Sequence, residues 1–403
     1  MSTLPKSYPW IEKLVGFQTV SETPNADLLK VLADEFEKYD LTPHYTYSDD
    51  ETRANMFVTI PAADGTTTGG IVISGHTDVV PVEGQDWDTD PFTPVVKGDK
   101  LYGRGVADMK SYIATAMQLL PEMVKANLTK PIHFAFSYDE EIGCVGAPRM
   151  IDDLVARGVK PEYCIVGEPS MMQVISAHKG AHRGRVTIRG VAKHASLAPH
   201  GVNAVAVGGK FITFIDDLAS EWLTDGPFDS DFVAPFSTAA ANVARGGVQY
   251  NIVAQDCVVE YDFRSLPSID ADAVLQRIER KVEELGKELV ERARVAEELA
   301  EAEEGSLQSQ VSIEHELLAR VPALGTPDGH DVIELGKSFG GVGNGAKVTY
   351  GTEGGQFQEA GVATIVCGPG DIAQAHTPNE WIELNQIEQC EQFMENLLCW
   401  ARS

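Results

Sequence analysis

Residues 71–76 read I-V-I-S-G-H, a short apolar run that ends on a histidine. Two later stretches share this design, because I-H-F-A-F-S-Y-D precedes Glu140 and Glu141, and Y-C-I-V-G precedes Glu168. Each run is rich in β-branched and aromatic residues and is bounded by Gly, Pro or charge, which is typical of a buried strand. Each places an imidazole or a carboxylate at the carboxyl end of its strand, the edge of an open α/β sheet where ligands bind. These stretches therefore predict an α/β fold with a polar site at one sheet edge.

Five side chains at such places form a candidate metal shell. They are two imidazoles and three carboxylates, without a thiolate: His76, Asp108, Glu141, Glu168 and His376. This donor set suits a pair of borderline divalent ions such as zinc, with cobalt or manganese as alternatives. Any buried strand can also leave its sheet at a polar residue, so a purely structural role for each residue is the alternative. Because all five occur in one chain, a two-metal hydrolytic site is the first hypothesis.

The composition indicates an acidic globular chain. Its 403 residues are too many for one ordinary core and predict two domains, with three as the alternative. Hydrophobic residues make up 43% of the chain, and no run approaches the roughly 18 apolar residues of a membrane span. The formal net charge of −28 argues against nucleic-acid partners, which are bound through Lys and Arg clusters. The N-terminal M-S-T-L-P-K-S-Y-P-W lacks the continuous apolar core of a signal peptide, so we expect a cytoplasmic protein with no membrane partner.

The six cysteines show no C-x-x-C spacing. Cys164 and Cys367 lie within apolar, strand-like runs. Reduced thiols in the core are therefore favoured over disulfides or metal ligands, in keeping with the expected cytoplasmic location.

The spacing of the candidate ligands predicts how the chain is divided. The first four follow one another at intervals that are each long enough for a strand, a helix and their turns. The longer gap before the fifth has a different pattern: a strand at 185–189, a helix at 203–221, strands at 237–244 and 257–264, and a long helix at 269–302. We therefore expect a catalytic domain of residues 1–181 and 320–403, interrupted by an inserted α+β domain of residues 182–319. The acidic segment near 297–310 is low in aromatics and is expected to be solvated.

These motifs resemble the two-domain, co-catalytic zinc amidohydrolases, which include aminoacylase, glutamate carboxypeptidase, succinyl-diaminopimelate desuccinylase and acetylornithine deacetylase. The resemblance covers nearly the whole chain, because all five ligand motifs occur in the family's order with the family's insertion between the fourth and the fifth. It implies a zinc-peptidase-like α/β domain with a central mixed sheet between helices, and an inserted α+β domain that serves as dimerisation and lid domain. It also implies that His76, Glu168 and the bridging Asp108 hold one metal, while His376, Glu141 and Asp108 hold the other.

The same resemblance assigns roles to residues beside the metals. Asp78 would orient His76 from behind, and Glu140 would be the general base that takes a proton from a water bridging the two ions. In this family a histidine of the inserted domain, contributed across a dimer interface, donates a hydrogen bond to the tetrahedral oxyanion. The stretch A-K-H-A-S matches it at His194, for which a plain surface position is the alternative. A homodimer is therefore implied, and His200 stands where relatives usually carry an arginine.

Several further residues resemble the family's substrate contacts. Asn251 in Q-Y-N-I-V and Arg264 in D-F-R-S-L-P match residues that bind the substrate carboxylate, with a local turn or salt bridge as the alternative. The Gly354-Gly355 pair permits close backbone approach, so its amides are expected to receive the α-carboxylate, with a plain tight turn as the alternative. Glu353 is expected to bind the side-chain ammonium of the substrate.

The resemblance is closest to the acetylornithine deacetylases, through H-K-G at 178–180, G-V-N-A at 201–204 and Y-G-T-E-G-G-Q-F-Q at 350–358. It implies hydrolysis of N2-acetyl-L-ornithine to L-ornithine and acetate, in arginine biosynthesis, with two divalent ions as cofactors. Another acyl-amino acid, such as acetylcitrulline or succinyl-diaminopimelate, or a dipeptide is the alternative substrate. A metal-binding homologue without catalysis is the non-enzyme alternative, against which the intact Glu140 and Asp78 argue.

Overall fold

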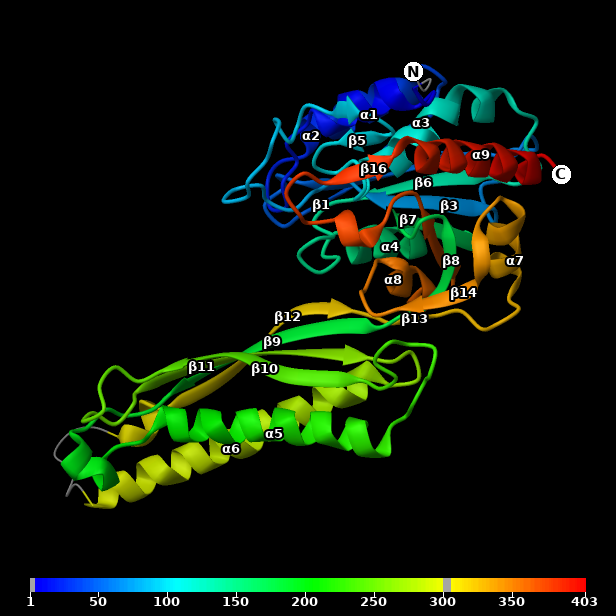
Figure 1. Cartoon of the computed structure of the whole chain (residues 1–403). Coiled ribbons are helices and arrows are strands. Elements are labelled where there is room, and N and C mark those ends of the chain that lie inside the picture. The colour runs from blue at the N-terminus through cyan, green and yellow to red at the C-terminus, as the bar shows by residue number, and fades with distance from the viewer. Residues whose placement is uncertain (1–3, 300–305) are drawn as a thin grey trace. The chain divides into compact units, whose positions relative to one another are not determined.

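Two units make up the computed structural model, which describes residues 4–299 and 306–403 (Figure 1). The first unit runs to His178 and resumes at Ala323, and the second unit is the continuous segment Lys179–Pro322. The inserted domain expected from the sequence comprised residues 182–319. Each unit has a buried hydrophobic cluster of its own, so each is held together by its own core.

A nine-stranded mixed sheet forms the centre of the first unit. Its strands pair in the order β1-β2-β6-β3-β7-β15-β8-β13, and β14 also pairs with β8. They span His44–Tyr47 (β1), Ala54–Ile60 (β2), Ile71–His76 (β3), Ile132–Ser137 (β6), Tyr163–Pro169 (β7), Gln173–His178 (β8), Leu324–Gly325 (β13), Val342–Val348 (β14) and Ala363–Gly368 (β15). The central strands β6, β3, β7 and β15 are parallel to one another. Their carboxyl ends therefore meet at one edge of the sheet.

Helices cover both faces of this sheet (Figure 1). The side chains of β3 alternate, because Ile71 and Ile73 join one buried cluster whereas Val72 joins another. The first cluster includes residues of α1 (Tyr8–Val15), α2 (Ala26–Glu37), α3 (Lys110–Lys125), α7 (Asp331–Ser338) and α9 (Leu384–Ala401). The second includes residues of α4 (Ala147–Ala156) and α8 (Gly354–Glu359). The expected α/β domain with a central mixed sheet between helices is thereby confirmed.

A separate three-stranded sheet joins two loops of the first unit. In it β5 (Lys100–Tyr102) pairs with both β4 (Val95–Lys97) and β16 (Trp381–Glu383). The chain just before Asp108 is thereby fixed beside the chain just after His376, although the two are far apart in sequence. This small sheet brings the loop of the last candidate ligand to the others.

The second unit is a four-stranded antiparallel sheet that packs against two long helices. The strands pair in the order β10-β11-β9-β12. They are β9 (Gly180–Arg189), β10 (Thr238–Gly246), β11 (Asp256–Ser265) and β12 (Ser312–Val321), and the helices are α5 (Ala204–Asp225) and α6 (Ala271–Leu299). Alternate residues such as Val186 and Ile188 of β9 enter the core with the apolar faces of both helices.

The sequence predicted three of these four strands and both helices, but not β12. Residues 300–302 of the predicted long helix, and residues 300–305 of the acidic segment, lie outside the described residues. Short 3-10 helices occur at Ala195–His200, Leu307–Ser309 and Ile372–Gln374.

No helix within residues 4–299 and 306–403 is long and apolar enough to cross a membrane. All six cysteines are free thiols, and five of them are buried, as the sequence predicted. Cys399 differs because it is exposed.

Candidate metal centre

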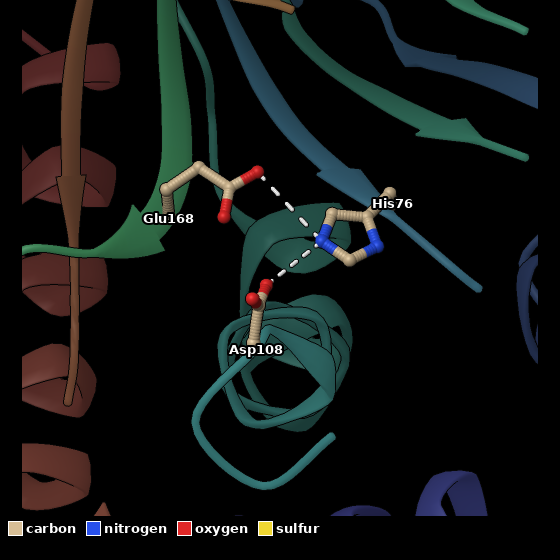
Figure 2. Close-up of side chains that lie close together, drawn as sticks. All are labelled: His76, Asp108 and Glu168. Atoms are coloured by element: carbon tan, nitrogen blue, oxygen red, sulfur yellow. Dashed lines mark hydrogen bonds and ion pairs between the residues drawn. The ribbon is translucent and has the colours of Figure 1, made fainter. Parts of the chain in front are cut away.

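Three candidate ligands converge at the carboxyl ends of β3 and β7 (Figure 2). His76 ends β3, Glu168 lies near the end of β7, and Asp108 lies just before α3. The Nε2 atom of His76 lies 2.9 Å from Asp108 Oδ1 and 3.7 Å from Glu168 Oε1. All three side chains are buried, and one ligand atom of each lies within 4.8 Å of the others. They form a group of nitrogen and oxygen donors that one divalent ion can share.

Asp108 also belongs to a second such group, with Glu141 and His376. The Nε2 atom of His376 lies 2.8 Å from Glu141 Oε2 and 3.3 Å from Asp108 Oδ2. The two oxygens of Asp108 therefore face different histidines, Oδ1 facing His76 and Oδ2 facing His376. This is the arrangement expected of a carboxylate that bridges two ions.

Without metal, the pKa values of several residues at this site are raised, so these residues hold protons that a divalent cation could replace. Burial raises the pKa of Glu140 to about 8 and that of Glu141 to about 7, and it also raises the pKa of Glu168. Hydrogen bonds to Asp108 and Glu141 raise the pKa of His376 to about 10. A divalent cation would displace these protons. In addition, Glu168 Oε1 is buried and has no hydrogen-bond partner among the residues that the structure describes, so it keeps its full capacity as a ligand.

The turn that follows β3 sets the orientation of His76. Its Nδ1 lies 2.9 Å from the backbone carbonyl oxygen of Asp78 and 3.5 Å from Asp78 Oδ1. An N–H at Nδ1 that donates to this carbonyl leaves the lone pair on Nε2, which faces the other ligands. The carboxylate of Asp78 accepts hydrogen bonds from Ser21 Oγ at 2.8 Å and from the backbone nitrogens of Glu140 at 3.1 Å and Glu141 at 3.3 Å. Asp78 thus joins the histidine to the segment that carries the expected base.

Glu140 lies in this segment next to Glu141 but belongs to neither ligand group. The thiol of Cys144 donates a hydrogen bond to Glu140 Oε1 at 3.1 Å, and its backbone nitrogen donates to the Glu140 carbonyl at 2.7 Å. Cys144 has a left-handed backbone with φ 53°, and its own carbonyl accepts a hydrogen bond from the Gln356 side chain at 3.0 Å. This tight turn holds the carboxylate of Glu140, and no sequence pattern points to the role of Cys144 in it.

Glu353 is fully buried at the start of α8. One of its oxygens accepts a hydrogen bond from Ser74 Oγ, and the other accepts one from Ser137 Oγ at 2.7 Å. The backbone nitrogen of Gly354 donates to the side chain of the preceding threonine at 3.0 Å. These contacts fix the start of the helix. The expected roles of Glu353, Gly354 and Gly355 at the substrate stay predictions.

Three expected site residues, His194, Asn251 and Arg264, belong to the second unit. His194 is exposed, and its Nδ1 accepts a hydrogen bond from the backbone nitrogen of Ser196 at 3.3 Å. The backbone carbonyl of Asn251 accepts one from the residue after His194 at 2.8 Å, so the two predicted residues are neighbours. Arg264 donates through Nε to Asp262 at 2.7 Å, the local salt bridge that was the alternative for this residue. Its expected contact with a substrate carboxylate stays a prediction.

Comparisons with known proteins identify the family to which the chain is similar. The family described as peptidase family M20/M25/M40 matches residues 72–399. An acetylornithine deacetylase from Proteus mirabilis is 32% identical to the chain, over 86% of this chain and 83% of its own length. A second acetylornithine deacetylase, from Shigella sonnei, is 29% identical over 97% of this chain and 98% of its own. Among solved structures, an M20 family metallo-carboxypeptidase from Sulfolobus solfataricus superposes with a TM-score of 0.73 at 17% identity, and each chain is fully covered.

Proposed function

The chain belongs to peptidase family M20/M25/M40 and is a metal-dependent hydrolase of amide bonds, and we propose that its substrate is N2-acetyl-L-ornithine. The observation that supports a two-ion hydrolytic site is the position of Asp108, whose two carboxylate oxygens face one histidine each. Two relatives that match most of the chain are acetylornithine deacetylases, which supports this substrate over others. The products would be L-ornithine and acetate, and the reaction would serve arginine biosynthesis.

Two divalent ions are the proposed cofactors, zinc in the first place, with cobalt as an alternative. His76, Asp108 and Glu168 would hold one ion, and Asp108, Glu141 and His376 would hold the other. When bound, two such ions lower the pKa of a water between them and polarise the carbonyl of the substrate.

Glu140 is the proposed general base. Its carboxylate would take a proton from the attacking water while the water oxygen bonds to the carbonyl carbon of the acetyl group. It would then deliver this proton to the nitrogen of the leaving amine as the amide bond breaks, which balances the hydrolysis. The hydrogen bond from Cys144 to Glu140 Oε1 supports this role, because it holds one oxygen and leaves the other free to exchange a proton.

His194 is the proposed donor to the tetrahedral oxyanion. Its Nδ1 accepts a hydrogen bond from the backbone N–H of Ser196, so the neutral ring carries its proton on Nε2. No residue within 4–299 and 306–403 is a hydrogen-bond partner of this Nε2, which leaves its N–H available to an oxyanion. We propose that the protein is a homodimer in which His194 of one subunit serves the site of the other, as the family resemblance implies.

Substrate recognition is proposed for residues that the family resemblance indicates. Arg264 and Asn251 are proposed to bind the α-carboxylate, together with the backbone amides of Gly354 and Gly355. Glu353 is proposed to bind the ornithine ammonium. That role requires one of its oxygens to exchange a serine partner for the ammonium, since both oxygens accept hydrogen bonds from serines in the structure.

A substrate panel on zinc-loaded and cobalt-loaded protein tests this proposal. It compares acetylornithine, acetylcitrulline, acetylmethionine, succinyl-diaminopimelate and dipeptides by kcat/KM, with Glu140→Gln as the inactive control. We expect acetylornithine to have the highest value. A higher value for a succinylated substrate or a dipeptide would contradict the proposed substrate while preserving the chemistry. Two bound ions without hydrolysis of any amide would instead identify a catalytically silent homologue.

A further inference from the structure

Glu380 is a fully buried carboxylate four residues after the ligand His376. Its Oε1 accepts hydrogen bonds from the backbone nitrogens of Ala107 at 2.8 Å and Asp108 at 3.2 Å. Its Oε2 accepts hydrogen bonds from the backbone nitrogen of Gly105 at 3.1 Å and from Arg104 Nη1 at 2.7 Å. One side chain therefore binds four donors in the segment that ends at the bridging Asp108.

The same network continues from Arg104 to the backbone of His376. Arg104 is also buried, and its Nη2 donates a hydrogen bond to Gln85 Oε1 at 2.5 Å. The amide nitrogen of Gln85 then donates to the carbonyl oxygen of His376 at 2.9 Å. His376 has a left-handed backbone with φ 64°, a conformation that needs support from its surroundings. Gln85 supplies such a contact at the carbonyl of the ligand itself.

We propose that Gln85, Arg104 and Glu380 form a relay of hydrogen bonds between two ligands of the site. The relay fixes the bridging Asp108 and the ligand His376 relative to each other, and thereby sets the affinity for the ion pair. The two ends of the relay contact ligands that belong to different numbers of ligand groups. Glu380 acts on Asp108, which belongs to both ligand groups, whereas Gln85 acts on His376, which belongs to one. The three residues are positioning residues, since none of them belongs to a ligand group. The inference rests on the proposed two-ion site and is independent of the proposed substrate.

The small sheet of β4, β5 and β16 makes this relay testable by substitution. Backbone pairing of Trp381 with Tyr102, and of Glu383 with Lys100, joins the same two loops independently of the three side chains. Loss of a side-chain contact therefore leaves the loops paired and alters only how their ligands are held.

The first variant is Glu380→Gln, which keeps the size of the side chain. An amide NH₂ group replaces one oxygen and is left facing two hydrogen-bond donors, so the segment up to Asp108 loses one of its two acceptor oxygens. The second variant is Gln85→Met, which keeps the length of the side chain and removes both of its contacts in the relay. The matched control is Glu391→Gln, because Glu391 accepts two hydrogen bonds from Ser7, at 2.7 and 2.8 Å, and contacts no candidate ligand.

Stepwise zinc affinities are measured by competition with a chelator, and bound zinc is counted after dialysis. We expect Glu380→Gln to lower the affinity for both ions by about 10- to 100-fold, the usual effect of losing a partner of a metal ligand. We expect Gln85→Met to lower the affinity for one ion by about 10-fold or more and to leave the affinity for the other unchanged. Thermal midpoints of the metal-free proteins show whether each variant is folded. Destabilisation of the fold alone would lower the thermal midpoint, and in Gln85→Met it would not discriminate between the two ions.

Unchanged zinc affinities in both variants would overturn the relay. If Glu380→Gln does not fold, Gln85→Met decides alone, because Gln85 is only half-buried and its replacement leaves Glu380 in place. None of these measurements uses a substrate. Failure of acetylornithine hydrolysis would therefore reject the proposed substrate and leave the relay standing, whereas normal hydrolysis with unchanged affinities would reject the relay alone.

Discussion

The backbone nitrogen of Glu140 donates a hydrogen bond to the carboxylate of Asp78 at 3.1 Å. Asp78 also lies behind the ligand His76, whose Nδ1 is 2.9 Å from the Asp78 carbonyl oxygen. One residue therefore fixes the ring of a proposed metal ligand and the backbone of the proposed base. Its carboxylate is buried and also accepts a hydrogen bond from Ser21, so it has little freedom to move.

Asp78→Asn is expected to lower zinc affinity or turnover by about 10- to 100-fold, the usual effect of altering a partner of a metal ligand. The reason is that its amide NH₂ group must face one of the donors that now bind a carboxylate oxygen. Zinc competition titrations and steady-state rates measure the two effects. Asp64→Asn is the control, since Asp64 is an exposed turn residue that accepts a hydrogen bond from Thr66. Equal behaviour of both variants would show that Asp78 does not position the site.

Glu140→Gln is expected to lower turnover by at least ~10²-fold, the scale of a general-base contribution, while the protein still binds two ions. Glu141→Gln should instead lose affinity for one ion, because Glu141 belongs to a ligand group and Glu140 does not. Metal analysis and steady-state kinetics on the same preparations separate the two residues. A Glu140 variant that lost metal but kept its rate would reverse these assignments.

The strands that carry the candidate ligands could be predicted because their signals are local. Ile71 to Ile73 form an apolar run that ends at His76, and Tyr163 to Val166 form one that leads to Glu168. The parallel pairing of these strands in the structure explains why their polar ends meet.

The contacts that hold the site could not be predicted, because they join residues that are far apart in sequence. Ser74 and Ser137 are separated from Glu353 by 279 and 216 residues, and no pattern around Glu353 indicates that it is buried. The hydrogen bonds from the Asp108 segment to Glu380 span more than 270 residues. The missed strand β12 has a mixed burial pattern along its length, which weakens the alternation that marks a strand.

Mixing two inactive variants, His194→Ala and Glu140→Ala, tests whether His194 acts in the partner's site. A mixed dimer would contain one site with both residues intact, so about a quarter of all sites should recover at equal, random exchange on a two-fold dimer. Activity is measured after subunit exchange, and a mass measurement on the same samples shows whether mixed dimers have formed. Mixed dimers without activity would mean that His194 serves its own chain or has no catalytic role.

The stability of the first unit should fall in acid because of His133. Its Nδ1 contacts Thr59 Oγ1 at 2.9 Å and its Nε2 contacts the Gly69 carbonyl at 2.9 Å, and burial lowers its pKa to about 4. The ring is therefore neutral in the folded protein, whereas an unfolded chain takes up a proton below about pH 6.5. Stability should be lost as the pH falls from about 6.5 towards 4, by up to about 1.4 kcal/mol per pH unit.

Urea unfolding of the metal-free protein across this pH range measures the effect. His133→Gln should reduce the pH dependence, because the amide cannot take up the proton. Thr59→Val should keep it, because it removes the hydroxyl and leaves the histidine in place. An identical pH dependence in wild type and His133→Gln would contradict the assignment.

Strand β15 lies between β7 and β8 in the central sheet, although the second unit separates β15 from both of these strands in sequence. During synthesis the second unit is therefore complete while β7 still lacks a neighbour on one side. At about 5 to 20 residues per second, the ribosome needs at least about 10 s to travel from the end of β8 to His376. His376 is the last candidate ligand to be synthesised, so the earlier ones lack a complete second ligand group until then. Only a chain translated through His376 can assemble both candidate ligand groups, so the proposed ion pair would mark a polypeptide whose synthesis has reached that point.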